Sequence, residues 1–421
     1  MRLAVFLSAK GHLALIAALL VLLSLAVNSS FERDQEDLLH GSCQGEDHPD
    51  THFAHEPTRR DVETHDAAVE PKTVSKTEGG DGGGCGCSKG TERRRRQSKE
   101  VEAQIAGFDE TARPVEIPDE VRELFSSVAP SKLVNIKGGM FIMGTTEVVN
   151  ALDGESPPRK VIVSDFALQE TEVSIAQFAR FVMETNHVTD AEKFGWSFAF
   201  EKTLSKEVLG TITQAVAQVP WWLPVNGTNW LYPDGPDRSA FPSRMNHPVT
   251  HVSHNDAKAY CAWLDLRLPT EAEFEYAMRG GLENKTFPWG DDIVPEGRHR
   301  ANLWQGHFPD QNTVEDGYEY SAPVDAFGPQ NAFGLYNIVG NVWEWVADAW
   351  ITNHAKLDLS KPLVDPQIEL QGKMDRNDTE RVKRGGSYMC HKSYCLRYRT
   401  ASRSSNSADS SAQNLGFRCA S

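Results

Sequence analysis

The stretch Arg267-Leu268-Pro269-Thr270-Glu271-Ala272-Glu273 marks where a helix begins in this chain. Thr270, followed three residues later by Glu273, forms a capping box, in which each side chain bonds a free backbone N–H of the first helical turn. The helix is expected to continue through Tyr276 and to stop at Gly280-Gly281, because glycine readily takes the left-handed conformation that ends helices. The stretch therefore predicts a short helix between two irregular segments.

A second capping box, Ser174-Ile175-Ala176-Gln177, begins another predicted helix. Phe178, Phe181 and Val182 follow it on one helical face. Alternation and paired glycines predict a hairpin at Leu133–Gly144. Two further strand candidates precede the helix, at Lys160–Val163 and Phe166–Leu168.

The remainder of the chain shows no regular pattern of elements. Trp221–Met245 carries Pro, Gly and Asn and is expected to be irregular but packed by its tryptophans, and turn residues dominate from Pro288 onward. We find no internal repeat, no alternation of strands and helices, and no phosphate-binding glycine loop. The pattern predicts one α+β domain with much irregular structure, covering residues 129–421.

The composition is that of a globular protein with a substantial core. The chain has 421 residues, of which 39% are hydrophobic and 24% are charged. Its formal net charge of −16 argues against a nucleic-acid partner and gives no indication of an anionic membrane as a partner.

Residues 1–27 have the pattern of a signal peptide. Arg2 and Lys10 precede an apolar run over residues 13–27, which is too short to span a bilayer comfortably. A cleaved signal leaves no membrane association, whereas an uncleaved anchor is the alternative. Entry into the secretory route permits disulfides. It also makes three glycosylation sequons usable, at Asn226, Asn284 and Asn377.

Residues 28–128 are predicted to be a disordered extension, because they are acidic, rich in glycine and poor in aromatic residues. Cys85 and Cys87 lie there on a glycine tether, which suits thiol exchange with a partner. Arg93–Arg96 resembles a proprotein-convertase site, with a solvated charge run as the alternative. The chain ends Arg418-Cys419-Ala420-Ser421, which is not an ER-retrieval tetrapeptide, so retention in the ER is expected to need a partner.

Cys390 and Cys395 form a second close pair, in a segment rich in tyrosine and arginine. A fully extended chain would separate their Cα atoms by roughly 16 Å, and a disulfide needs roughly 4.4–6.8 Å. The chain must therefore fold back between them if their sulfurs are to meet, and Gly385-Gly386 gives it the conformational freedom to do so. Spacing alone leaves open a structural disulfide, a redox pair or a metal-binding pair.

Several segments together resemble the formylglycine-generating enzymes, or sulfatase-modifying factors. Four of these segments are shared with the wider superfamily: Gly139–Gly144, Arg267–Glu273, Gly334–Trp345 and Asn414–Cys419. The segment Gly385–Cys395 is more specific, because it resembles the catalytic segment of the eukaryotic secretory members, and a non-catalytic group of the family lacks its cysteine pair. The resemblance implies a single domain of the C-type-lectin-like superfamily.

The resemblance also implies an activity. Members oxidise a cysteine in newly made, unfolded sulfatases to Cα-formylglycine in the ER lumen, and partial secretion is a further expectation. The substrate motif is Cys-x-Pro-x-Arg, and dioxygen and a thiol reductant are co-substrates. Removal of a hydrogen from the substrate β-carbon gives a thioaldehyde, which water converts to the aldehyde. Members bind copper(I) through two cysteines, here Cys390 and Cys395, which agrees with the preference of thiolates for cuprous ion.

Other residues acquire roles only through the resemblance. Ser387 matches a polar catalytic residue. The matched residues of the oxygen and substrate pocket are Trp343, His391, Tyr394 and Asn414. One calcium site is matched by Asn302, Leu303, Asp316 and Tyr318, and a second by Asn337, Gly340, Val342 and Glu344. Cys261 and Cys419 match a structural disulfide, and Cys85 and Cys87 match an exchange pair, which leaves Cys43 without an assignment.

Two alternatives to the oxidase remain. One is a thiol-disulfide oxidoreductase that uses Cys390 and Cys395, although the Cys-x-x-Cys spacing typical of that class is absent. The other is a module that binds sulfatase peptides without modifying them. The retained cysteine pair argues against the second, whereas absence of copper binding would favour it.

Overall fold

The computed structural model describes residues 112–421, except for residues 118, 217–218, 355–356 and 369–379. The predicted signal peptide, Cys43, the Cys85 and Cys87 pair, Arg93–Arg96 and the sequon at Asn377 lie outside the described residues. Within the described part of the chain, no helix combines the length and the apolar character needed to cross a membrane.

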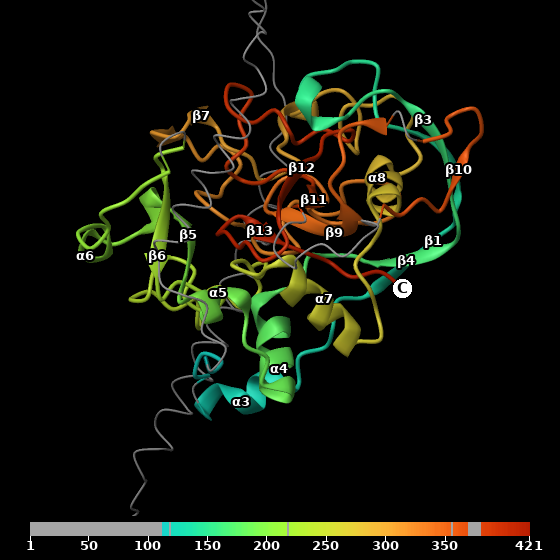
Figure 1. The fold of residues 1–421 in the computed structure, drawn as a ribbon. Coiled ribbons are helices and arrows are strands. Elements are labelled where there is room, and N and C mark those ends of the chain that lie inside the picture. The colour runs from blue at the N-terminus through green and yellow to red at the C-terminus, as the bar shows by residue number, and fades with distance from the viewer. Residues whose placement is uncertain (1–111, 118, 217–218, 355–356, 369–379) are drawn as a thin grey trace, which may run out of the picture. The chain divides into compact units, whose positions relative to one another are not determined.

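A four-stranded sheet lies in the middle of the domain (Figure 1). Its strands, in spatial order, are β12 (Ser404–Ser407), β11 (Glu380–Arg384), β9 (Trp343–Ala349) and β13 (Leu415–Gly416). β11 is antiparallel to β9 and β12, whereas β13 runs parallel to β9. Lys383 pairs with Trp345, and Arg384 with Glu344, across the two central strands. This sheet carries the start of the Cys390 segment at the end of β11.

Smaller sheets surround the central one. They pair β1 (Leu133–Ile136) with β4 (Phe166–Gln169), β2 (Gly139–Met143) with β3 (Arg159–Val163) and β3 with β10 (Leu363–Val364), β5 (Trp196–Phe200) with β6 (Trp222–Asn226), and β7 (Gly306–His307) with β8 (Gln311–Asn312). All these pairs are antiparallel except β3 with β10.

The predicted hairpin at residues 133–144 is wrong, although both of its strands exist. β1 and β2 pair with β4 and β3, and not with each other. Gly138 lies against the turn that joins β3 to β4, where an added Cβ would be 2.3 Å from the Val163 carbonyl oxygen. The glycines therefore allow a close crossing of two chain segments and do not form a turn.

The six helices of the described residues include the two predicted ones, which begin at their capping boxes, and four that were not predicted. Their bounds are α3 (Asp119–Ser126), α4 (Ile175–Thr185), α5 (Asp190–Phe194), α6 (Lys206–Leu209), α7 (His254–Trp263) and α8 (Glu271–Arg279), with short 3₁₀ turns at Ala151–Asp153, Glu201–Thr203 and Pro295–Gly297. Both bonds of the box are present at Ser174 and at Thr270. Gly280 ends α8 with a φ of 57°, in the left-handed region.

The predicted disorder of residues 28–128 extends too far toward the domain. Helix α3 lies within that range, and Phe125 is only 1% exposed because its ring packs edge-on against Phe241 at 6.3 Å. Ile117 is also buried. These two buried apolar side chains anchor the segment to the core. The acidic composition of the surrounding sequence led to the prediction of disorder.

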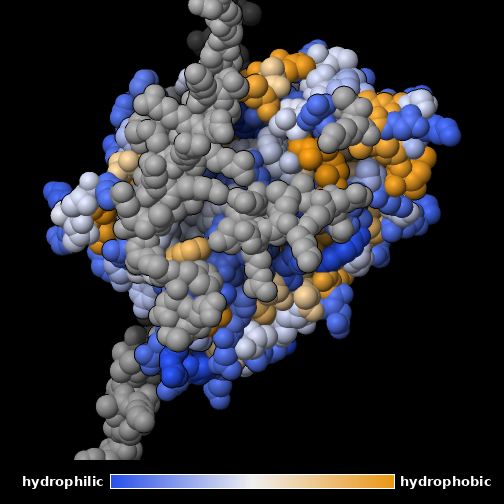
Figure 2. All heavy atoms as spheres, viewed as in Figure 1, coloured by the Kyte–Doolittle hydropathy of each residue, from blue (hydrophilic) through white to orange (hydrophobic). Residues whose placement is uncertain are grey.

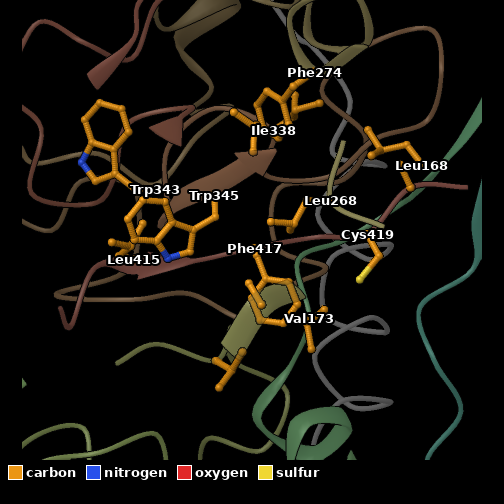
Figure 3. Packing of buried hydrophobic residues seen from close by; sticks show 14 of the residues in the cluster. Leu168, Val173, Leu268, Phe274, Ile338, Trp343, Trp345, Leu415, Phe417 and Cys419 are labelled. Atoms are coloured by element: carbon orange, nitrogen blue, oxygen red, sulfur yellow. The ribbon is translucent and has the colours of Figure 1, made fainter. Parts of the chain in front are cut away.

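The core collects residues from distant parts of the chain (Figure 3). Trp345 of β9 is fully buried, and its indole N–H donates to the Val252 carbonyl at 3.1 Å. Phe417 packs beside it near Val173, which precedes α4. Cys261 of α7 and Cys419 form a disulfide, as the resemblance implies. On the face seen in Figure 2, hydrophilic side chains separate the apolar patches.

Candidate active site

The active segment begins with a sharp change of direction after β11. Gly385 and Gly386 have φ values of 92° and 77°, which other residues adopt only under strain. A Cβ on Gly385 would lie 3.0 Å from the Ile338 carbonyl oxygen, and one on Gly386 would lie 3.0 Å from Tyr398 Cα. The two glycines therefore let the chain pass close to its neighbours and enter the site.

The chain then folds back between the two cysteines, as their spacing requires. The Cys390 N–H donates to the Ser387 carbonyl at 2.8 Å, and the Cys395 N–H donates to the His391 carbonyl at 2.8 Å. The two Sγ atoms lie 2.6 Å apart, and both thiols are free and buried. The two sulfurs are farther apart than in a disulfide bond and closer than two ligands of one metal ion, so either state needs only a small shift of the side chains.

The cysteines line a cavity of about 330 Å³. Ser387, Trp343, Tyr394 and Asn414, all assigned to the site by resemblance, line the same cavity. His391 is not among its lining residues, because its Nδ1 lies 2.7 Å from Ser393 Oγ at the exposed end of the turn. Further lining residues are Phe198, Val216, Val219, Trp222, Lys383, Met389, Arg397, Ser404, Asn406 and Ala412.

Ser387 is held in a fixed orientation beside Cys390. The side-chain amide of Asn414 donates to Ser387 Oγ at 2.9 Å, and the Met389 N–H donates to the same atom at 3.4 Å. Asn414 is itself fixed, because its carbonyl accepts from the Trp343 N–H at 2.8 Å. The hydroxyl is therefore placed toward the cavity by its neighbours.

Aromatic rings form one wall of the cavity. The Tyr394 ring stacks on Phe308 with centroids 4.4 Å apart, and it meets the edge of Trp221 at 5.0 Å. Tyr394 is still 39% exposed, so it lies at the cavity mouth. These contacts give a site that is apolar on one side and open to solvent on the other.

The two thiols differ in acidity. A hydrogen bond from Cys390 lowers the pKa of Cys395 to about 7 against the effect of burial, with help from the positive charge of Arg397. Burial raises the pKa of Cys390, and the neighbouring Cys395 raises it further. Cys395 is therefore the thiol that ionises first at neutral pH.

Two cations of the site were missed by sequence reasoning. Lys383 lines the cavity from β11, and Arg397 lines it from beyond Cys395. Arg397 Nε donates to Asp153 Oδ2 at 2.5 Å, which ties the active segment to the 3₁₀ turn at Ala151–Asp153. The available signal was their position, since both flank the cysteine segment in sequence.

The cysteine pair fits a cuprous ion. Two free thiols converge in a cavity, and thiolates are the ligands that select Cu(I) at low coordination number. Among the described residues no group of three or more His, Cys, Asp or Glu side chains could hold a metal ion. The donor set is therefore unlike the four-ligand sites of structural zinc.

The first predicted calcium group is gathered in one place. The N–H groups of Leu303 and Tyr318 each donate to the carboxylate of Asp316 at 3.0 Å. The side-chain Oδ1 of Asn302 is buried and has no hydrogen-bond donor. A buried acceptor oxygen without a donor fits an oxygen-preferring cation.

The second predicted group is built on the segment that leads into β9. The Asn337 Oδ1 is also buried without a donor. Gly340 touches the first group, because a Cβ there would lie 2.6 Å from the Asn302 carbonyl oxygen. Val342 follows it on the same segment. Glu344 is partly neutralised by Arg418, which donates to its two oxygens at 2.7 and 2.8 Å. Asn337 Oδ1 is therefore free to ligate a cation, whereas the Glu344 carboxylate is already paired with Arg418.

A second carboxylate, that of Glu172, is buried near the same Arg418. One of its oxygens accepts from the Asn341 amide at 2.9 Å, and the other has no donor. Burial raises the pKa of Glu172 from 4.5 to about 8, with Glu344 adding to the effect and Arg418 opposing it. Glu172 is therefore neutral in the folded protein at pH 7.

This burial predicts a pH-dependent stability. A pKa that is raised on folding contributes stability below pH 4.5, and that stability is lost as pH rises through 8. Glu172→Gln is expected to unfold like the wild type at pH 4.5 and to be more stable by at least about 1 kcal/mol at pH 8. Urea unfolding at both pH values measures this. Equal stability of the two proteins at pH 8 would contradict it.

Comparison with known proteins places this site in a family. Residues 122–421 match the family model described as "Sulfatase-modifying factor enzyme 1-like domain". The chain therefore belongs to the sulfatase-modifying factor family. The formylglycine-generating enzyme of Mus musculus is 56% identical over 293 residues, which cover 70% of this chain and 76% of that protein.

Two further relatives show the range of the family and of the fold. The inactive C-alpha-formylglycine-generating enzyme 2 of Bos taurus is 43% identical over 291 residues, covering 69% of this chain and 87% of that protein. The solved structure of PvdO from Pseudomonas aeruginosa has a TM-score of 0.50 at 23% identity, covering 69% of this chain and 94% of that one. That likeness establishes the fold alone, which agrees with the predicted α+β class.

Proposed function

We propose that this protein oxidises a cysteine in the Cys-x-Pro-x-Arg motif of unfolded sulfatases to Cα-formylglycine, and thereby activates them. The observation that carries the proposal is the pair of free thiols of Cys390 and Cys395, 2.6 Å apart in a cavity of about 330 Å³. High identity to a protein named formylglycine-generating enzyme supports the same reaction.

The reaction balances with dioxygen and a thiol reductant. The substrate cysteine loses two hydrogens, one of them from its β-carbon, and becomes a thioaldehyde. Dioxygen takes these two hydrogens and two more from two reductant thiols, giving two waters and one disulfide. One water then adds to the thioaldehyde and expels hydrogen sulfide, which leaves the aldehyde. The protein must therefore hold the substrate thiol, admit oxygen and allow the reductant thiols to supply the remaining two hydrogens.

Cys390 and Cys395 would hold copper(I), which when bound supplies the means to activate dioxygen at neutral pH. The chain's own residues do the remaining work. Cys395 reaches its ionised form first, and Arg397 stabilises that form. Ser387, fixed by Asn414, offers a hydroxyl on the cavity wall for a developing negative charge.

The aromatic wall serves binding of the polypeptide. Tyr394 is half open to solvent and stacked on Phe308, so it can pack against an extended chain without reorganising. Trp343 is buried and lines the same cavity as the cysteines. An extended substrate is accommodated because the cavity is lined by side chains of several loops and of five strands, with no covering helix among its lining residues.

Mass spectrometry of a synthetic Cys-x-Pro-x-Arg peptide tests the proposal. The peptide is incubated with protein, copper(I), reductant and oxygen, and the aldehyde is trapped with a hydrazide. We expect the wild type to give the trapped product and Cys395→Ser to give none. Unchanged peptide with folded, copper-loaded wild type would reject the oxidase and favour a peptide-binding module.

Thiol-disulfide exchange is the second candidate function, and the short distance between the two sulfurs favours it. An exchange enzyme would oxidise or reduce a dithiol peptide without oxygen. Activity that persists in anaerobic buffer and leaves no aldehyde would identify that function. The burial of Cys390, at 1% exposure, speaks against ready exchange with a protein disulfide.

We further propose that both calcium groups are structural. Chelation of calcium is expected to lower the melting temperature of the wild type by about 5 °C, because a ligand that binds only the folded state stabilises it. Asn302→Leu is expected to lose about half of that shift, since it removes the donor-free oxygen. Asn135→Leu, on the exposed edge of β1, is the control. A wild type that is unaffected by chelation would contradict the proposal.

The ER lumen, with partial secretion, is the proposed location. The predicted signal peptide directs the chain into the secretory route, where newly made secretory sulfatases would still be unfolded. The described disulfide between Cys261 and Cys419 is compatible with an oxidising environment. Cys85 and Cys87 are proposed to exchange with an ER thiol partner that retains the protein.

A further inference from the structure

Lys383 is a positive side chain of the cavity to which the chemistry above assigns no role. It lines the same cavity as Cys390 and Cys395. Its ammonium donates to Asn406 Oδ1 at 2.6 Å and lies 5.0 Å from the centre of the Trp343 ring. Both partners are uncharged, and no salt bridge to Lys383 occurs within the described part of the chain.

The two cysteine sulfurs line the same cavity as this ammonium, and they are the groups there that can become negative. Burial lowers the pKa of Lys383 to about 8, and Cys395 and then Cys390 exert the strongest opposing influences. Glu380, at the other end of β11, has a weaker effect of the same sign, and Arg397 acts in the opposite direction. A partly buried cation without a carboxylate partner is costly unless other negative charge compensates it.

We propose that Lys383 supplies, together with Arg397, the positive charge that balances the cysteine pair, so that its ammonium raises the affinity of the two sulfurs for a cuprous ion. This inference rests on the proposed function. Two thiolates around one cuprous ion carry a net negative charge, which a neighbouring cation stabilises. Arg397 shares its charge with Asp153, whereas the charge of Lys383 is not shared.

The fixed position of the ammonium supports a positioning role. Asn406 of β12 accepts its hydrogen bond, and the Trp343 ring of β9 lies beneath it. Three adjacent strands of the central sheet thus hold one charge beside the site. An exposed lysine would instead sample many rotamers and give little directed potential.

Cuprous-ion affinity tests the proposal directly. The metal alone is titrated anaerobically against a coloured cuprous chelator with wild type, Lys383→Met, Lys383→Arg and the control Lys160→Met, which changes an exposed lysine of β3. Lys383→Met is expected to bind about tenfold more weakly, Lys383→Arg within about threefold of wild type, and Lys160→Met equally well. Equal affinity of Lys383→Met and wild type would overturn the proposal.

A second measurement reports the electrostatic potential at Cys395 in the absence of metal. Iodoacetate and iodoacetamide are similar in size but differ in charge, so the ratio of their rates with Cys395 depends on local potential and not on the ionised fraction of the thiol. Lys383→Met is expected to lower this ratio about tenfold. If Lys383→Met leaves the ratio of the two rates unchanged, the proposal is overturned. This holds even if the variant binds copper weakly, because weak binding can also come from misfolding.

Asn406→Leu keeps the lysine and removes its hydrogen-bond acceptor. Asn406→Leu is expected to lower the iodoacetate-to-iodoacetamide rate ratio by about threefold. An unchanged ratio in this variant would count against the positioning role of Asn406. A wild type that binds no cuprous ion would overturn the proposed use of copper and this inference together. A wild type that binds copper through the cysteines, with Lys383→Met binding equally well, would overturn this inference alone.

Discussion

Replacement of Cys395 by serine is expected to lower kcat/KM for peptide oxidation at least about 1000-fold, while the melting temperature stays within a few degrees of wild type. Serine is nearly isosteric, so the packing around position 395 is retained. Its hydroxyl does not ionise at neutral pH and is a poor ligand for a soft cation. The variant is therefore expected to lose catalytic activity while keeping its folding stability.

The two cysteines are expected to act as one unit. Cys390→Ser should cost as much as Cys395→Ser, and the double variant should be no worse than either, because one sulfur alone cannot hold the site. Ser393→Ala, on the exposed part of the same turn, is the matched control and should retain activity. Additive losses in the double variant would show that the two thiols work independently.

Replacement of Arg384 by methionine is expected to destabilise the domain by about 3–5 kcal/mol. Arg384 is fully buried, and its guanidinium donates to Glu271 at 2.9 Å, to Glu275 at 2.7 Å and to the Thr400 carbonyl at 2.7 Å. Methionine fills similar space but leaves two buried carboxylates with less positive charge. Chemical unfolding at pH 7 measures the difference.

The same change should alter acid sensitivity. Burial disfavours the ionised form of Glu271, but Arg403 and Arg384 outweigh burial and hold its pKa at about 2. A pKa lowered by folding contributes stability that is lost as pH falls from the unfolded value of 4.5 toward the folded value of about 2. Arg384→Met should hold the pKa of Glu271 less far below 4.5, so its stability, already lower at pH 7, should fall by less between pH 5 and pH 2 than that of wild type. Arg122→Met, at an exposed ion pair with Asp119, should change neither property.

Local signals in the sequence predicted the elements whose ends are set by neighbouring residues. Helices α4 and α8 begin at Ser174 and Thr270 because a capping box needs only four consecutive residues. Helix α7 was missed although Ser253 and Asp256 form the same motif, since the aspartate at the third position is a less common partner. Strand β9 was missed as a strand because nearly all of its residues are buried, which removes the alternation that identifies a strand.

Local patterns also predicted only part of the candidate site. The spacing of Cys390 and Cys395 showed that the chain must fold back, and it does. Lys383 flanks the cysteine segment in sequence, but the fixed position of its side chain depends on the pairing of three strands, which no local pattern shows. The error over the hairpin has the same origin, since the partners of β1 and β2 are chosen by the tertiary structure.

The last strand has a consequence for how the protein is made. β13 and the residues after it complete the core, with the Val173 N–H bonded to the Phe417 carbonyl and the Gln169 N–H bonded to the Cys419 carbonyl, both at 2.9 Å. During vectorial synthesis the early half of the domain therefore waits, incompletely packed, until this segment leaves the ribosome. Folding is then expected to follow translation, and a premature stop only a few codons early would yield a chain without a closed core.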